Sequence, residues 1–322
     1  MTEYWDLDWP RAHGGTAITA EFRREPEDFV VEEQGDPVLT DTGEHVYLQV
    51  RKRGANTSWV AQQLARVAGV SPRDVGFFGL KDRHAVTTQW FSVWLAQRPE
   101  PDWTAIVSEE VEILRCSRGQ RKLRRGEHTG NRFQIRLRDT RGDRDRAEQL
   151  LASLAGGVPN YFGEQRFGRD GGNLTLARRL AEEGGRARRS ERTFAMSAAR
   201  SWLFNQVLGQ RVKDGSWREL LDGEPQPYPS APLWGRGRNP ATRVQAGLEA
   251  AAVAPWQPWC DWLEHCGLKQ ERRALVLQPG DLEHEWHGDD LQLAFSLPVG
   301  TFATAVLREL AELANAAAGA IK

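Results

Sequence analysis

One carboxylate, Asp82, stands out because of the residues around it. It lies between Lys81 and Arg83, after the aromatic string Phe-Phe-Gly-Leu and before a β-prone run that begins at Ala85. A carboxylate held among positive charges stays ionised and can act as a nucleophile or an electrostatic stabiliser. An aspartate in such a string, taken alone, is more often a turn residue or a surface ion pair. Neighbouring side chains of an extended chain point to opposite faces, so an active Asp82 needs a cation from elsewhere in the sequence.

A strongly basic segment follows this motif. The whole chain has a net charge of −1, but residues 115–146 hold twelve Lys and Arg against four Asp and Glu, a local charge of +8. Such an excess suits a surface that binds phosphate, and arginine pairs with phosphate through two parallel hydrogen bonds. The alternative is that these residues form a solvated face, whose positive charge is balanced by the acidic residues of the N-terminal segment.

Size and composition indicate a soluble two-domain protein. The chain has 322 residues, 40% of them hydrophobic and 27% charged, and roughly 100–200 residues per domain is usual. Its three cysteines do not form a disulfide pattern, which fits a reducing compartment. No window reaches the roughly 20 apolar residues of a membrane span, and the acidic start lacks the features of a signal peptide. We therefore expect a cytoplasmic protein.

Neither a metal site nor a nucleotide loop is predicted. Two cysteines and three histidines gather late in the sequence, but they lack the paired spacing of zinc ligands: Cys260, Cys266, His265, His284 and His287. The glycines of residues 168–172 lack the endings of phosphate-binding motifs and are read as a loop.

The elements that must position Asp82 follow from the hydrophobic periodicity. Strands are predicted at residues 28–33, 45–51, 88–95, 131–138 and 286–297, and helices at 57–67, 144–155 and 301–318. Residues from about 157 to 280 differ in character, being mostly helical with a loop-rich stretch at 223–243. This order indicates a discontinuous domain that carries an insertion.

The Asp82 string resembles the active-site motif of the tRNA pseudouridine synthase D (TruD) family. The shared pattern is aromatic-Gly-x-Lys-Asp-x-His-Ala-x-Thr-x-Gln-Trp, which here ends at Trp90. Further blocks resemble the family's other motifs in the family's order, over nearly the whole chain: residues 26–32, 130–133, 157–168, 197–206 and 297–304.

The resemblance implies an α/β fold of the α+β type. It consists of a pseudouridine synthase catalytic domain with a mixed, largely antiparallel sheet, formed by residues 1–156 and 283–322. An α/β TRUD domain is inserted at residues 157–282. The RNA is expected in a basic cleft between the two, with the basic segment and arginines such as Arg166 and Arg169.

The resemblance also implies an activity and its residues. The protein would be an isomerase that converts uridine 13 of tRNA to pseudouridine, with base flipping and with neither cofactor nor metal. Asp82 would be the nucleophile, although the atom that it attacks stays open. The substrate would be bound by four residues: Phe29, Asn131, Phe133 and Phe302. The family has a lysine shortly before the motif at residues 26–32, and this chain has Arg23 there. Arg23 is therefore the candidate partner of Asp82. No function is predicted for Lys81 and His84.

Three other functions would fit parts of this sequence. An RNA-binding module without turnover is disfavoured by the intact Asp82. A uracil methyltransferase needs a nucleophilic cysteine and a glycine motif for its cofactor, and neither is evident. A synthase acting on a different RNA remains open. The predicted partner is tRNA around uridine 13, with no membrane and no obligate protein partner.

Overall fold

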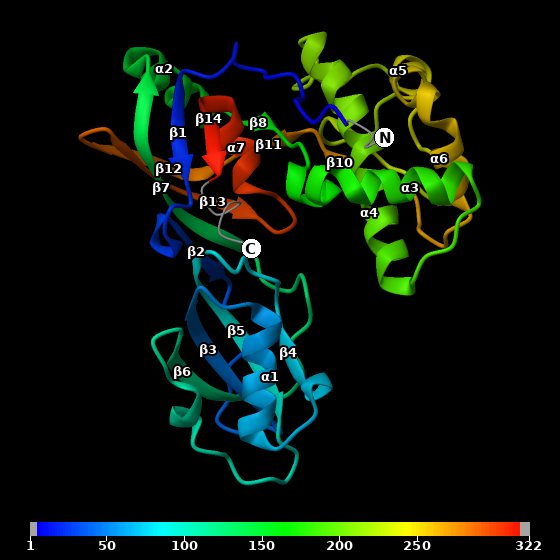
Figure 1. The fold of residues 1–322 in the computed structure, drawn as a ribbon. Coiled ribbons are helices and arrows are strands. Elements are labelled where there is room, and N and C mark those ends of the chain that lie inside the picture. Colours follow the sequence, from blue (N-terminus) through cyan, green and yellow to red (C-terminus); the bar gives the residue numbers. More distant parts are fainter. Residues whose placement is uncertain (1–4, 316–322) are drawn as a thin grey trace. The chain divides into compact units, whose positions relative to one another are not determined.

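The computed structural model describes residues 5–315 (Figure 1). The chain forms two compact units. Of the described residues, the sheet unit contains Ala17–Ala147, Pro279–Gly300 and 311–315; the helical unit contains 5–16, Glu148–Gln278 and Thr301–Leu310. The predicted division into a catalytic domain and an inserted domain stays a prediction, because compactness alone does not assign a role to either unit.

The sheet unit contains one sheet of ten strands. These are β1 (Ile18–Phe22), β2 (Phe29–Gln34), β3 (His45–Arg53), β4 (Val75–Phe77), β5 (Val86–Trp94), β6 (Val111–Gly119), β7 (Gly130–Gly142), β12 (Gly280–His287), β13 (Asp290–Pro298) and β14 (Ala311–Asn315).

Most neighbours in this sheet are antiparallel. The main order is β12-β13-β7-β2-β5-β3-β6, with β1 paired to β7 and β14, and β4 paired to β5. Among the described strands of this sheet, only the β2–β5 and β1–β14 pairs are parallel. The prediction of an α/β fold with a mixed, largely antiparallel sheet is confirmed.

Helix α1 (Thr57–Ala68) covers part of this sheet (Figure 1). Val60 and Leu64 recur at helical spacing and are fully buried, in one core with Val50 and Phe91 of the strands. The helix ends at Gly69, whose left-handed backbone (φ 63°) lets its N–H bond the carbonyls of the last turn.

The helical unit packs around an aromatic core in which Trp5 and Trp202 meet edge to face at 5.3 Å. Its helices are α3 (Gly172–Glu182), α4 (Arg189–Lys213), α5 (Arg243–Val253), α6 (Gln257–Glu264) and α7 (Ala303–Leu310), and α2 (Arg144–Leu154) begins in the sheet unit and ends here.

Four short strands form two pairs: β8 (Val158–Pro159) with β11 (Val276–Leu277), and β9 (Ser230–Leu233) with β10 (Glu271–Ala274). Short 3-10 helices occur in both units: Pro26–Asp28, Pro72–Asp74, Trp103–Ile106, Glu164–Phe167, Arg169–Gly171 and Ala254–Trp256.

The predicted helix at residues 301–318 was wrong in its second half. Helix α7 ends at Leu310, and residues 311–315 continue as β14, whose Ala311 lies beside Ile18 of β1. Alanine and leucine favour a helix, but β1 has a free edge on the side away from β7, and pairing satisfies the backbone groups of that edge. The last three residues of the prediction, 316–318, lie outside the described residues.

Two more parts of the sheet differ from the prediction. Strands β1, β4 and β6 were not predicted, and residues 286–297 form most of a hairpin whose first strand, β12, begins at Gly280. Its turn uses Gly288 with a positive φ of 64°. Within the described part of the chain, no helix is both long enough and apolar enough to cross a membrane.

Candidate active site around Asp82

The sheet unit brings Arg23 and Asp82 together. Arg23 directly follows β1, and Asp82 lies in the loop that leads into β5. An Arg23 amino group donates a hydrogen bond of 2.7 Å to Asp82 Oδ2. The arginine side chain is 7% exposed, whereas the Asp82 side chain is 42% exposed. A buried cation thus holds a carboxylate that solvent or a ligand can reach.

Aromatic rings fix the guanidinium of Arg23. Its central carbon lies 4.0 Å from the ring centre of Phe29 and 4.8 Å from that of Phe22. Burial lowers the pKa of Arg23, and the charge and hydrogen bond of Asp82 oppose that shift. The residue has a positive φ of 59°, so its backbone turns sharply after β1.

The loop before Asp82 is fastened by buried polar side chains. The Thr57 hydroxyl accepts the backbone N–H of Lys81 at 3.0 Å and donates to Gln89 Oε1 at 2.9 Å. The amide of Gln89 donates in turn to the Gly79 carbonyl at 3.0 Å. Helix α1 and strand β5 therefore fix the loop on either side of Leu80.

Lys52 supports the same loop from behind. Its ammonium donates to the carbonyl of Asp82 at 2.9 Å and to that of Ala55 at 2.7 Å, and the residue is 0% exposed. Burial lowers the pKa of Lys52 to about 8, although the negative charge of Asp82 acts in the opposite direction.

Asn131 belongs to a second group of polar contacts, which is built around Lys81, the residue before Asp82. Lys81 Nζ lies 2.9 Å from Glu33 Oε1 and donates to Asn131 Oδ1 at 2.7 Å. Glu33 faces Asn131 across the β2–β7 pair, and its other oxygen accepts the backbone N–H of Trp90 at 3.1 Å. Burial raises the pKa of Glu33, and the charge of Lys81 opposes that rise. The loop lysine therefore braces the site and joins two strands.

Phe29 and Phe133 lie in one row of rings across β2, β7 and β13. Their ring centres are 5.9 Å apart, and Phe133 stacks on Phe295 at 5.6 Å. Phe133 is 7% exposed and Phe29 is 3% exposed. Asn131 and Phe133 share a face of β7 because they are two residues apart on a strand.

Phe302 lies in the helical unit, just before α7. Its ring centre is 6.0 Å from that of Phe162, and the Arg166 guanidinium lies 5.5 Å from it. The site residues of the sequence prediction are thus distributed over both units: Arg23, Phe29, Asp82, Asn131 and Phe133 belong to the sheet unit, and Phe302 belongs to the helical unit.

Much of the basic segment is paired with acidic side chains. Six of its arginines form ion pairs: Arg115 with Asp36, Arg118 with Glu100, Arg121 with Glu127, Arg132 with Glu283, Arg136 with Asp290, and Arg138 with Glu25 and Asp28. The local excess of positive charge is therefore smaller in the fold than the segment alone indicates.

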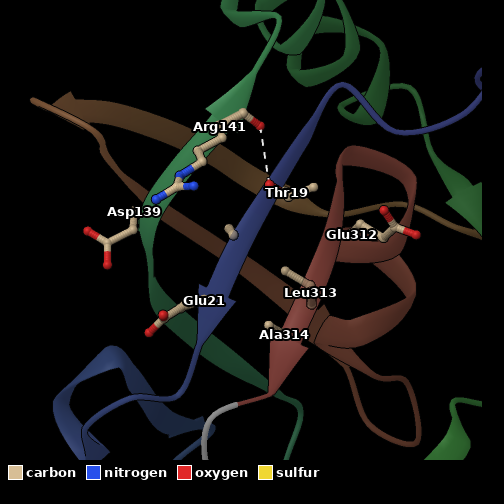
Figure 2. A pocket seen from close by; sticks show the side chains of 8 residues that line it. Thr19, Glu21, Asp139, Arg141, Glu312, Leu313 and Ala314 are labelled. Carbon is tan, nitrogen blue, oxygen red and sulfur yellow. Dashed lines mark hydrogen bonds between the residues drawn. The ribbon is translucent and has the colours of Figure 1, made fainter.

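A shallow hollow lies elsewhere on the sheet unit, against β1, β7 and β14 (Figure 2). Its lining mixes acidic groups with one arginine and apolar side chains: Thr19, Ala20, Glu21, Asp139, Arg141, Glu312, Leu313 and Ala314. None of the predicted site residues lines it, and its acidic rim does not suit a phosphate.

No three His, Cys, Asp or Glu side chains in the described part of the chain gather as a metal site requires. His84 points its Nε2 into the protein without a hydrogen-bond partner among the described residues. Its function stays unassigned.

Three residues of this site were not identified from the sequence, Glu33, Lys52 and Thr57, and Gln89 lies within the Asp82 motif but was given no role. A signal did exist for Lys52, because the inward alternation of Val46, Leu48 and Val50 along β3 places Lys52 on the same face. No sequence pattern revealed that Thr57 and Gln89 would meet beneath the loop.

Known proteins resemble this chain over nearly its full length. A sequence model of the family described as tRNA pseudouridine synthase D (TruD) matches residues 12–180. A tRNA pseudouridine synthase D of Cellvibrio japonicus is 50% identical over 318 residues, covering 97% of this chain and 95% of the relative. The corresponding protein of Methylococcus capsulatus is 46% identical, covering 95% and 94%.

A solved structure shares the fold. The crystal structure of a Methanosarcina mazei protein assigned as a tRNA pseudouridine synthase D (TruD) superposes with a TM-score of 0.68 at 19% identity, covering 93% of this chain and 95% of the other. At that identity the likeness concerns the fold alone, but the sequence matches extend further. The chain therefore belongs to the tRNA pseudouridine synthase D (TruD) family.

Proposed function

We propose that the protein converts uridine 13 of tRNA to pseudouridine, with Asp82 as the nucleophile and without a cofactor. The names of its relatives support the reaction class and the tRNA substrate, and position 13 rests on the family resemblance. The observation that carries the role of Asp82 is its half-exposed carboxylate, held by the buried Arg23.

The reaction needs no external reagent. The bond between N1 of uracil and C1′ of ribose breaks, the base turns, and a bond between C5 and C1′ forms, while the proton of C5 is lost and N1 gains one. Nothing is oxidised or reduced. A carboxylate suits this chemistry because it can add to the base or to C1′ and then leave again.

Arg23 gives Asp82 a defined direction. The hydrogen bond uses Oδ2, and no described residue donates a hydrogen bond to Oδ1. Oδ1 is then the oxygen that attacks. The ion pair with Arg23 holds the carboxylate in one orientation, which supports a positioned nucleophile.

The predicted substrate-binding residues would receive a flipped uridine. Extrusion of a base costs a few kcal/mol, and a stacked aromatic ring returns roughly 1–3 kcal/mol. We assign contact with the base to Phe133 and Phe29, its polar edge to Asn131, and a further contact to Phe302 beside Arg166. Residues 1–156 with 283–322 would form the catalytic domain and 157–282 the inserted TRUD domain.

The test maps pseudouridine in tRNA from cells that lack this protein. We expect the modification at position 13 to disappear, to return with the wild-type protein, and to stay absent with Asp82→Asn. Survival of the modification in the deletion strain, with no second enzyme present for that position, would refute the assignment.

Arg23 is tested with two substitutions. Arg23→Ala should lower kcat about 100-fold, whereas Arg23→Lys should recover part of the rate because it keeps a cation beside Asp82. Full turnover of Arg23→Ala alongside an inactive Asp82→Asn would show that the ion pair is dispensable.

A further inference from the structure

The contact between Lys81 and Asn131 fixes which way the amide of Asn131 faces. An ammonium group only donates hydrogen bonds, so the Asn131 atom 2.7 Å from Lys81 Nζ must be the carbonyl oxygen. The amide nitrogen then points the other way. Among the described residues nothing accepts a hydrogen bond from it, and it is not one of the buried polar atoms that lack partners.

Lys81 is itself held in place. Its side chain is 7% exposed and that of Glu33 is 1% exposed, with 2.9 Å between Nζ and Oε1. Glu33 is anchored by the backbone N–H of Trp90 at 3.1 Å, and the backbone of Lys81 by the Thr57 hydroxyl at 3.0 Å. An ammonium fixed at both ends can orient a neighbouring amide, which a mobile surface lysine cannot do.

The oriented amide is held by the residue next to Asp82 in the chain. Lys81 directly precedes Asp82, and Asn131 shares a face of β7 with Phe133. Exposure alternates along the loop: Leu80 is 58% exposed, the Lys81 side chain 7% and the Asp82 side chain 42%. Lys81 therefore points inward to Asn131 while Asp82 points outward.

We infer that Lys81, paired with Glu33, is a positioning residue that turns the amide N–H groups of Asn131 toward the substrate, where they donate to a carbonyl oxygen of uracil. The inference rests on the proposed function. A flipped amide would present an oxygen to that carbonyl, and two acceptors repel each other. Lys81 thus acts on the base only through Asn131.

The simpler alternative is that Lys81 and Glu33 form a structural ion pair. Removal of one partner from such a pair destabilises a protein whatever the function of its neighbours. A loss of activity in Lys81→Met alone would therefore decide nothing.

A double-mutant cycle distinguishes a positioning role of Lys81 from a purely structural one. We expect Lys81→Met and Asn131→Ala each to lower kcat/KM for tRNA by about 10-fold or more, and the double variant to be no worse than Asn131→Ala within about 2-fold. If the two losses multiply instead, Lys81 acts independently of Asn131 and the inference is wrong.

Asn131→Asp provides a sharper variant. The aspartate keeps an oxygen for Lys81 but replaces the amide donor with a second acceptor. We expect it to lose as much activity as Asn131→Ala. Wild-type activity in Asn131→Asp would overturn the inference. Because Lys81→Met could fail to fold, Glu33→Gln serves as the second variant that loosens Lys81.

One readout does not depend on turnover. The side-chain amide of Asn131 gives ¹⁵N–¹H signals that can be assigned by their loss in Asn131→Asp. A charged donor on the carbonyl oxygen moves the ¹⁵N resonance downfield, so Lys81→Met should shift it upfield, and an unchanged resonance contradicts the orientation. If the wild-type protein forms no pseudouridine at position 13, the proposed function fails, whereas this measurement still tests the contact.

Discussion

Lys52 places a positive charge in the protein interior directly behind Asp82. Its two hydrogen bonds go to the carbonyls of Asp82 and Ala55, and misplacement of a reactive group by even 1 Å can cost about 100-fold in rate. We expect Lys52→Met, which keeps the volume, to lower kcat at least 10-fold, an estimate of about 1.4 kcal/mol for the lost contacts. Single-turnover kinetics measure it, with Lys213→Met at the exposed end of α4 as the control. An unchanged kcat in Lys52→Met would remove Lys52 from the site.

His128 makes the stability of the sheet unit depend on pH. Its ring stacks on Phe78 at 6.1 Å, and burial, with a smaller effect from the charge of Lys81, lowers the pKa of His128 to about 4. An unfolded histidine has a pKa of about 6.5. Between these values the unfolded chain binds a proton that the folded chain does not, so this residue makes stability fall as the pH drops from about 6.5 to 4.

His128→Phe should weaken this dependence, since phenylalanine keeps a ring on Phe78 and does not titrate. Urea unfolding of both proteins at several pH values between about 7 and 4.5 measures the effect. Equal slopes of stability against pH for the two proteins would contradict the prediction.

At the scale of elements, the first residue of α1 joins the helix, the Asp82 loop and β5. Thr57 is 1% exposed and uses its hydroxyl both as donor and as acceptor. Thr57→Val has nearly the same shape but leaves Gln89 Oε1 and the Lys81 N–H without this partner. Each such buried group costs about 1–3 kcal/mol.

We therefore expect Thr57→Val to lower both the free energy of unfolding and kcat. Thr57→Ser is the matched control because it retains the hydroxyl, and it should keep most of both. Urea unfolding and single-turnover rates distinguish the variants. Equal values for serine and valine would show that the hydroxyl does not fasten the loop.

The elements also show where sequence patterns suffice. Strands β2 and β7 follow from their alternation, and α1 follows from its helical spacing, because local periodicity determines them. Strand β14 depends on an edge that β1 supplies from nearly 300 residues away, at Ile18 beside Ala311.

The same limit applies to the site. Asp82, Gln89 and Asn131 lie in recognisable motifs, and alternation along β3 turns Lys52 inward. That these side chains meet Thr57 and the Asp82 loop depends on long-range register that no local pattern contains.

For the molecule as a whole, the overall composition does not show how the charges are distributed and paired. The net charge is −1, and many arginines of residues 115–146 are neutralised by partners. Attraction for a polyanion then depends on the arginines that remain available rather than on the total. Arg124 and Arg125 are exposed, and neither side chain forms an ion pair with another described residue. Arg125 also lies 5.4 Å from the ring centre of Phe77, at the start of the Asp82 motif.

Replacement of this arginine pair should weaken tRNA binding through charge alone. We expect Arg124→Gln with Arg125→Gln to raise the Kd for tRNA and to reduce the slope of log Kd against log salt by roughly 1 to 2. The slope falls because binding releases fewer counterions when fewer phosphate contacts form. Arg136→Gln, in the same segment but paired with Asp290 at 2.6 Å, is the control and should change the slope less. Binding titrations over a range of salt concentrations measure all three proteins.

The same slope in the double variant as in the wild type would mean that the RNA does not contact this loop. A reduced slope with an unchanged single-turnover rate at saturating tRNA would separate its role in binding from the chemistry at Asp82.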